Sequence, residues 1–142
     1  MSVRSVLGAI AGLVASVVIV LVVESIGHLL FPPPPGMDLS NPAALATLIS
    51  QLPFGALAFV MLAWIAGAFG GGAVAAWIAR RSWPAWVVGV LMLAGGVWSM
   101  IVIPHPVWMQ VGLVPATLLP AWLAGQIWST PRRRGALPGP PG

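Results

Sequence analysis

Glu24 and His28 lie one helical turn apart in the mostly apolar stretch VESIGHLLFPPPPGMD, residues 23–38, which ends in Asp38. Residues at i and i+4 share one face of a helix, so the carboxyl and the imidazole can interact. Such a pair can form a structural contact, ligate a metal ion or exchange protons. The other ionisable side chains besides arginine are Asp38 and His105. What these four residues can do depends on the elements that position them.

The composition predicts that lipid surrounds most of the chain. Of its 142 residues, 59% are hydrophobic and only 6% are charged, and the mean hydropathy is +1.01. A soluble domain carries about 25% charged residues. The chain has no cysteine, which excludes disulfides and thiolate chemistry. Its six basic residues are arginines scattered between apolar blocks, a pattern typical of membrane flanks and not of a nucleic-acid-binding face.

Four apolar segments are long enough to cross a bilayer, which takes about 20 residues of helix. Pro32 to Pro35 end the first segment, Arg80, Arg81 and Pro84 separate the second from the third, and Pro104 and Pro106 separate the third from the fourth. We therefore expect an all-α membrane protein, an antiparallel four-helix bundle forming a single domain over residues 1–130. The expected spans are residues 6–30, 54–79, 86–103 and 107–128, followed by a disordered cytoplasmic tail, residues 131–142.

The arginines predict how the chain is oriented. Arg4 precedes the first span, Arg80 and Arg81 follow the second, and Arg132, Arg133 and Arg134 follow the fourth, so all six fall on one side. The positive-inside rule places that side, with both termini, in the cytoplasm of a bacterium. Glu24, His28, Asp38 and His105 then gather at the outer end of the bundle in the inner membrane.

The outer loop DLSNPAALATLISQLP, residues 38–53, predicts a short amphipathic helix. Asn41 can cap a helix that begins at Pro42. Leu45, Leu48, Ile49 and Leu52 recur at helical spacing. Such a helix would lie on the outer membrane surface or cap the bundle.

Small residues predict which helix faces pack together, because close backbone approach drives association in lipid. Gly8 and Gly12 lie four residues apart in the first span, as do Gly67 and Gly71 in the second, so each pair lies on one side of its helix. We also expect the glycines of the third span, Gly95 among them, to be packing contacts.

The fourth span contains two prolines, Pro115 and Pro120, which leave the carbonyls of Val111 and Ala116 without their helical partners. A neighbouring hydroxyl can serve such a group, and Thr117 is the local candidate. Gln110 is expected to form an interhelical hydrogen bond.

Several roles remain open for the polar cluster of Glu24, His28, His105 and Asp38. Glu24 can hydrogen-bond His28 or backbone groups freed by the prolines, which is the structural interpretation that we favour. Two histidines and a carboxylate can instead hold a metal ion, or Glu24 can handle protons or a solute. Haem ligation by His28 and His105 has no specific support. Hydrolysis would need Ser25 as the nucleophile and His28 as its base, and the sequence offers no convincing oxyanion donors for them.

The motifs VESIGH, FPPPPGMD and IPHPVW resemble an uncharacterised family of small four-helix bacterial inner-membrane proteins with no established activity. The resemblance implies the same layout and no mechanism. From the residues we expect a non-enzymatic membrane protein without a cofactor, in contact with the lipid bilayer and not with nucleic acid. It would form a homo-oligomer or an accessory subunit of a membrane assembly. The alternative is a small transporter, or a protein that handles metal ions or protons, using Glu24, His28 and His105.

Overall fold

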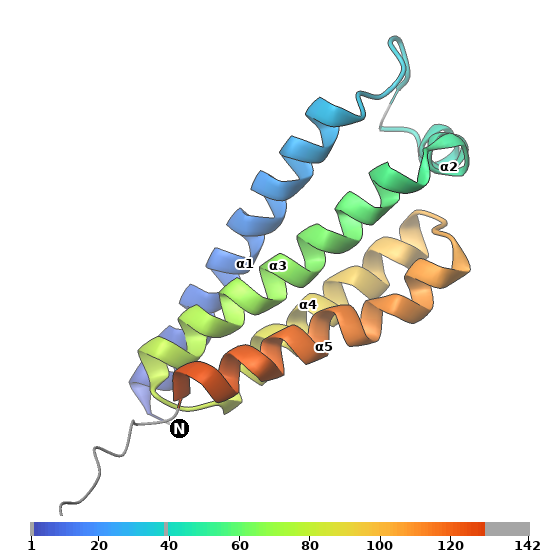
Figure 1. Ribbon diagram of the computed structural model, residues 1–142. Helices are drawn as coiled ribbons and strands as arrows, with labels where there is room; N and C mark the ends of the chain where they lie inside the picture. Colours follow the sequence, from blue (N-terminus) through green and yellow to red (C-terminus); the bar gives the residue numbers. More distant parts are fainter. Residues whose placement is uncertain (1, 39, 130–142) are drawn as a thin grey trace, which may run out of the picture.

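A computed structural model describes residues 2–38 and 40–129, which form five α-helices. Four long helices run antiparallel, and a short helix lies near one end (Figure 1). The expected all-α fold is thereby confirmed, including the short helix in the first long loop. The expected disordered tail, residues 131–142, lies outside the described residues, as do Arg132, Arg133 and Arg134. The helices are α1 (Val3–Leu30), α2 (Pro42–Gln51), α3 (Phe54–Ala79), α4 (Trp83–Val102) and α5 (Val107–Ser129).

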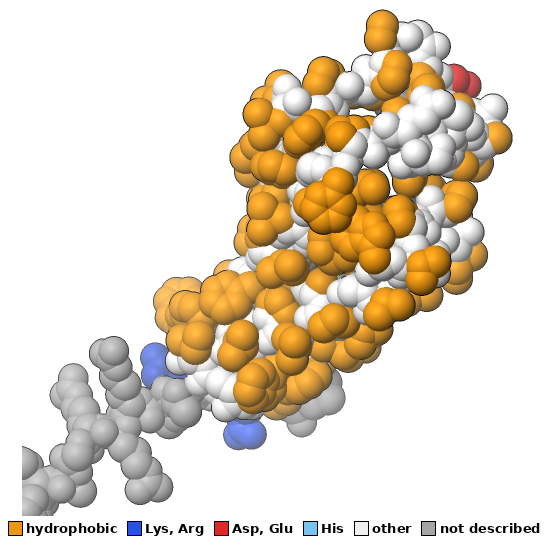
Figure 2. Space-filling model, turned by 45° about the vertical axis from the view of Figure 1, so that its right-hand side comes forward, with side chains coloured by type: hydrophobic (Ala, Val, Ile, Leu, Met, Phe, Trp, Pro, Cys, Tyr) orange, Lys and Arg blue, Asp and Glu red, His pale blue; other side chains and the backbone are white. Residues whose placement is uncertain are grey.

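The four long helices are each long and apolar enough to cross a membrane, so the protein is a multi-pass membrane protein. Figure 2 shows a surface dominated by hydrophobic side chains, with basic groups at one end and acidic groups at the other. We call these the arginine end, with Arg4, Arg80 and Arg81, and the histidine end, with His28 and His105. α1 begins and α5 ends at the arginine end (Figure 1).

Local chemistry sets most helix ends. The Phe31 N–H donates to Gly27 O at the end of α1, and the proline run follows. Asn41 caps α2 as predicted, because its side chain accepts from the Ala43 N–H at 2.9 Å while Pro42 occupies the first turn. α3 ends at Arg80, whose left-handed backbone (φ 55°) turns the chain towards α4.

α4 begins three residues earlier than expected. Pro84 does not separate the second span from the third; it lies in the first turn of α4. The N–H groups of a first turn have no helical partner, so a proline there removes no hydrogen bond. α1 likewise begins at Val3, before the expected boundary at residue 6.

α3 is the centre of the bundle and packs against α1, α5 and α4. At its contact with α1, the glycines of the two helices face each other. A Cβ on Gly8 would lie 2.8 Å from Ala75 O, and a Cβ on Gly12 would lie 2.5 Å from Gly71 O. A Cβ on Gly67 would lie 3.1 Å from Ser16 O. The backbones therefore approach too closely for any side chain at these positions, which is how helices associate in lipid.

Gly95 does not fit the packing prediction. A Cβ at this position would meet no atom within 4 Å, whereas the adjacent Gly96 packs against Leu113 and Trp64. Adjacent residues of a helix point about 100° apart, and here Gly96 faces α3 and α5 while Gly95 points away from the neighbouring helices.

The expected role of Thr117 is also wrong. Its hydroxyl donates to Leu113 O at 2.9 Å and to Val114 O at 3.3 Å. Neither is a carbonyl freed by Pro115 or Pro120, because a threonine hydroxyl reaches back only three or four residues along its own helix.

Candidate functional site

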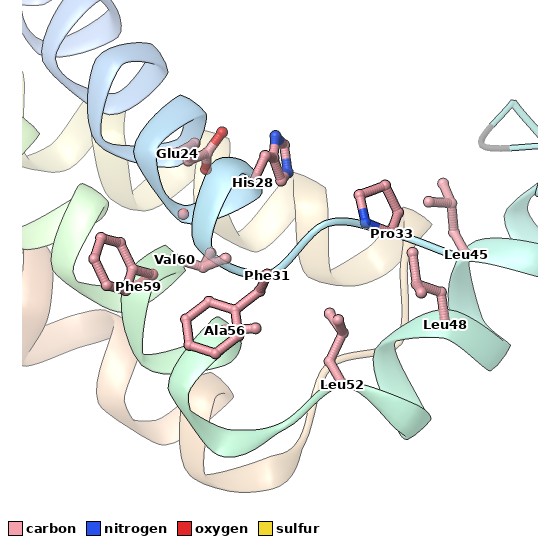
Figure 3. Close-up of a pocket in the computed structure, with 11 residues that line it drawn as sticks. Glu24, His28, Phe31, Pro33, Leu45, Leu48, Leu52, Ala56, Phe59 and Val60 are labelled. Carbon is pink, nitrogen blue, oxygen red and sulfur yellow. The ribbon is translucent and has the colours of Figure 1, made fainter. Parts of the chain in front are cut away.

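A cavity of about 370 Å³ lies at the histidine end between α1, α2 and α3. We call it the peripheral cavity; Figure 3 shows the residues around it. Glu24 and His28 of α1 are its ionisable lining residues, and the rest of its wall is apolar. The apolar wall includes Phe31, Leu45, Leu48, Leu52 and Phe59.

Two aromatic rings shape the floor of the peripheral cavity. Phe31, at the end of α1, packs against Phe59 of α3, with ring centroids 6.3 Å apart and planes tilted by 59°. Gly55 gives Phe31 its room, since a Cβ there would lie 2.8 Å from the end of the ring. Leu45 and Leu48 of α2, and Leu52 just after its end, complete the cavity (Figure 3). The prolines that end α1 thus lead the chain to α2, whose leucines line the same cavity as Glu24 and His28.

A second cavity of about 130 Å³, the central cavity, lies within the bundle at the same end. Its polar lining comes from Glu24 of α1, Ser99 of α4 and His105 of the turn between α4 and α5. Three methionines also line it, namely Met61, Met100 and Met109. This cavity is smaller than the peripheral cavity but has more polar groups for its size.

Glu24 and Val60 line both cavities, and Glu24 is the ionisable one of the two. His28 lines only the peripheral cavity and His105 only the central one. Glu24 is partly buried, while His28 is exposed. Among the described hydrogen bonds, none joins Glu24 to His28 or to backbone groups near the prolines, so the hydrogen-bonded pair favoured from the sequence is not present. The fold therefore separates the two histidines and leaves the carboxyl between them.

His105 is fixed by its own turn. Its Nδ1 lies 2.6 Å from Ile103 O, and its backbone carbonyl accepts from Gln110 Nε2 at 2.8 Å. Gln110 thus makes a local hydrogen bond and not the expected interhelical one. Proline residues on both sides of His105 restrict the backbone, which lets the short turn hold the imidazole in one place.

Asp38 does not join the other ionisable residues. It is exposed and lines neither cavity. Its Oδ1 accepts from the Ser40 hydroxyl at 2.5 Å and from the Ser40 N–H at 3.0 Å. These hydrogen bonds, the hydroxyl first, hold the pKa of the Asp38 carboxyl below its ordinary value. Asp38 therefore belongs to a loop turn and not to the candidate site.

Among the described residues, Ser25 and His28 do not form the hydrogen-bonded nucleophile and base that hydrolysis would need. The Ser25 hydroxyl donates to Leu21 O at 2.6 Å, within its own helix, and does not bond His28. In the described part of the chain, no three His, Asp, Glu or Cys side chains lie close enough together to hold a metal ion. The methionines of the central cavity were not predicted as site residues. The signal for two of them was present, because Met100 and Met109 bracket His105 in the sequence.

Comparison with known protein families, curated proteins and solved structures found no match to this chain. The resemblance carried by VESIGH, FPPPPGMD and IPHPVW stays a prediction. The arguments about function consequently rest on the fold and on the two cavities.

Proposed function

We propose that this chain is a non-enzymatic protein of the bacterial inner membrane that works by association, with copies of itself or as an accessory subunit of a membrane assembly. One observation carries the proposal. Leu91, Ala94, Gly95 and Trp98 are all exposed and lie on one face of α4 at helical spacing. A glycine that faces lipid, as Gly95 would in a monomer, makes no packing contact, whereas small residues on a helix face let a second helix approach closely.

The proposed orientation places the arginine end in the cytoplasm. Arg4, Arg80 and Arg81 gather at one end of the bundle, and the chain leaves α5 at that same end. The positive-inside rule supports a cytoplasmic location for both termini. The histidine end, with both cavities, then faces the periplasm.

Photo-crosslinking in native membranes tests the association. A benzophenone-bearing side chain placed at Trp98 should capture a neighbouring protein, since this position borders Gly95. Trp77 of α3 is the matched control, because Trp98 is 69% exposed and Trp77 is 68% exposed. A product of twice the mass of the chain indicates self-association, and a product with another protein indicates an accessory role. A monomer alone at Trp98, or equal capture at both positions, contradicts the proposal.

A second candidate function is supported by the position of Glu24. We propose, as the alternative, a small transporter or a protein that handles metal ions or protons with Glu24, acting with His28 in the peripheral cavity or with His105 in the central cavity. A carboxyl that borders two cavities can contact a solute in either one. Under this alternative, Glu24→Gln abolishes ion or solute flux into proteoliposomes while the fold survives. Unchanged flux in the variant, or no flux with the unaltered chain, would rule it out.

A further inference from the structure

Three methionines from three different helices line the central cavity. Met61 belongs to α3, Met100 to α4 and Met109 to α5, and all line the same cavity of about 130 Å³. Thioethers are soft donors, and among biological metal ions they favour Cu⁺. Methionine also fills irregular gaps in apolar cores, so its presence alone would not indicate a ligand site.

The imidazole of His105 provides an independent indication of a metal ligand. Its Nδ1 lies 2.6 Å from Ile103 O, and a carbonyl oxygen can only accept a hydrogen bond. Nδ1 therefore carries a proton, and in the neutral imidazole Nε2 then keeps its lone pair. A histidine that ligates a metal usually donates its other N–H to a carbonyl or carboxylate in this way. The turn thus leaves Nε2 of the neutral imidazole as the nitrogen that can ligate a metal ion.

The charges around the cavity favour a cation. Glu24 lines it, while Arg4, Arg80 and Arg81 lie at the opposite end of the bundle. A carboxylate within a membrane span is costly unless it is paired. A bound monovalent cation would balance it, and the indole of Trp64, which also lines the cavity, adds a π face that attracts cations.

We propose that the central cavity is a Cu⁺-binding site, with His105 and the thioethers of Met61, Met100 and Met109 as candidate ligands and Glu24 as the compensating charge. The proposal rests on the second candidate function, the handling of a metal ion at Glu24 and His105, and names the ion. Its donors are unsuited to Mg²⁺ or Ca²⁺, which take oxygen ligands. His28 and Asp38 have no part in the site.

Competition with a chromogenic Cu⁺ chelator tests the site. The full chain in lipid nanodiscs is given Cu⁺ under anaerobic, reducing conditions. We expect one bound equivalent, with X-ray absorption showing both sulfur and nitrogen neighbours. The combined variant Met61→Leu and Met100→Leu removes two sulfurs while nearly conserving volume, so the fold should survive. Its affinity should fall at least about tenfold, since losing even an outer partner of a metal ligand costs about 10–100-fold.

Met92→Leu is the matched control. Met92 is 6% exposed and packs with Ala75 and Val88, outside the central cavity. This variant should bind Cu⁺ like the unaltered chain. No binding by the unaltered chain, a spectrum without sulfur neighbours, or equal affinities in the control and the double variant would each overturn the proposal. This experiment measures Cu⁺ binding and not flux. A negative result would therefore overturn the Cu⁺ site alone, while transport of another solute and association at α4 are tested by the flux and crosslinking experiments.

Discussion

Glu24 is a candidate site residue because of the two cavities beside it and not because of a hydrogen-bonded partner. It borders both cavities, and none of the described hydrogen bonds involves its carboxyl. The sequence predicted that Glu24 and His28 share a face of one helix, because helical spacing is a local property. It could not predict that α3 and the turn after α4 would divide the space around the carboxyl into two cavities.

Replacing Glu24 with glutamine should not destabilise the fold. The change removes no hydrogen bond seen in the structure, and it removes a group that costs about 3 kcal/mol when charged within a span. Thermal unfolding of the purified protein, without added metal, should give a melting temperature equal to or above that of the unaltered chain. A clear decrease would show that the carboxyl makes a stabilising hydrogen bond and would contradict this account.

Ser16 makes the hydrogen bond that joins α1 to α3. Its hydroxyl contacts Gly67 O at 2.9 Å and Gly12 O at 3.0 Å. Ser16→Ala should lower the free energy of unfolding by about 0.6 kcal/mol, and by no more than about 1.7, as interhelical hydrogen bonds in membranes do. The control is Ser25→Ala, since Ser25 bonds only its own helix. Unfolding in mixed micelles compares the two, and equal stabilities would argue against the interhelical role.

Asp38 should titrate below its ordinary pKa of 3.8 because Ser40 donates two hydrogen bonds to the carboxylate. A lowered pKa contributes stability at pH above the ordinary value, and that contribution is lost as the pH falls through the lowered pKa. The carboxyl ¹³C shift of Asp38 measures the titration. Ser40→Ala should raise the midpoint towards 3.8, and an unchanged midpoint would disprove the assigned cause.

Helix ends and helix contacts differed in how far they could be predicted. Asn41 and Pro42 act on the turn that contains them, so the start of α2 was predicted correctly. The wrong predictions concern Pro84, Gly95, Thr117 and Gln110. The position of Pro84 depends on where the first turn begins, and that of Gly95 on which face a neighbouring helix covers. Thr117 and Gln110 instead form hydrogen bonds within their own helix and turn. Sequence spacing gives the faces of a helix but not the partner of each face.

The glycine contact between α1 and α3 should tolerate no side chain. In Gly12→Ala the new methyl group would lie 2.5 Å from Gly71 O and 2.7 Å from the Ala75 side chain. Overpacking of this kind costs about 1–3 kcal/mol. Gly95→Ala is the control, because that position is open and alanine favours helix. Unfolding of the detergent-solubilised monomer should show a loss for Gly12→Ala alone; equal stability of both variants would refute the predicted contact.

The four-helix bundle as a whole could be predicted largely from the composition of the chain. Four apolar segments, scarce charge and proline-rich connections determine a four-span protein, and the structure has those spans. The candidate metal site could not be predicted from the composition. Met61 is far in sequence from Met100, Met109 and His105, so only the fold brings these side chains to one cavity.

We propose that the histidine end, with its cavities, faces outward and that the arginine end faces the cytoplasm. The absence of native cysteine makes single-cysteine labelling a direct measurement. Ser40, at the histidine end, and Ser2, before α1, are both exposed. In intact spheroplasts, a membrane-impermeant maleimide should label Ser40→Cys, and it should label Ser2→Cys only after lysis. Labelling of Ser2→Cys in intact spheroplasts, or protection of Ser40→Cys, would contradict the account.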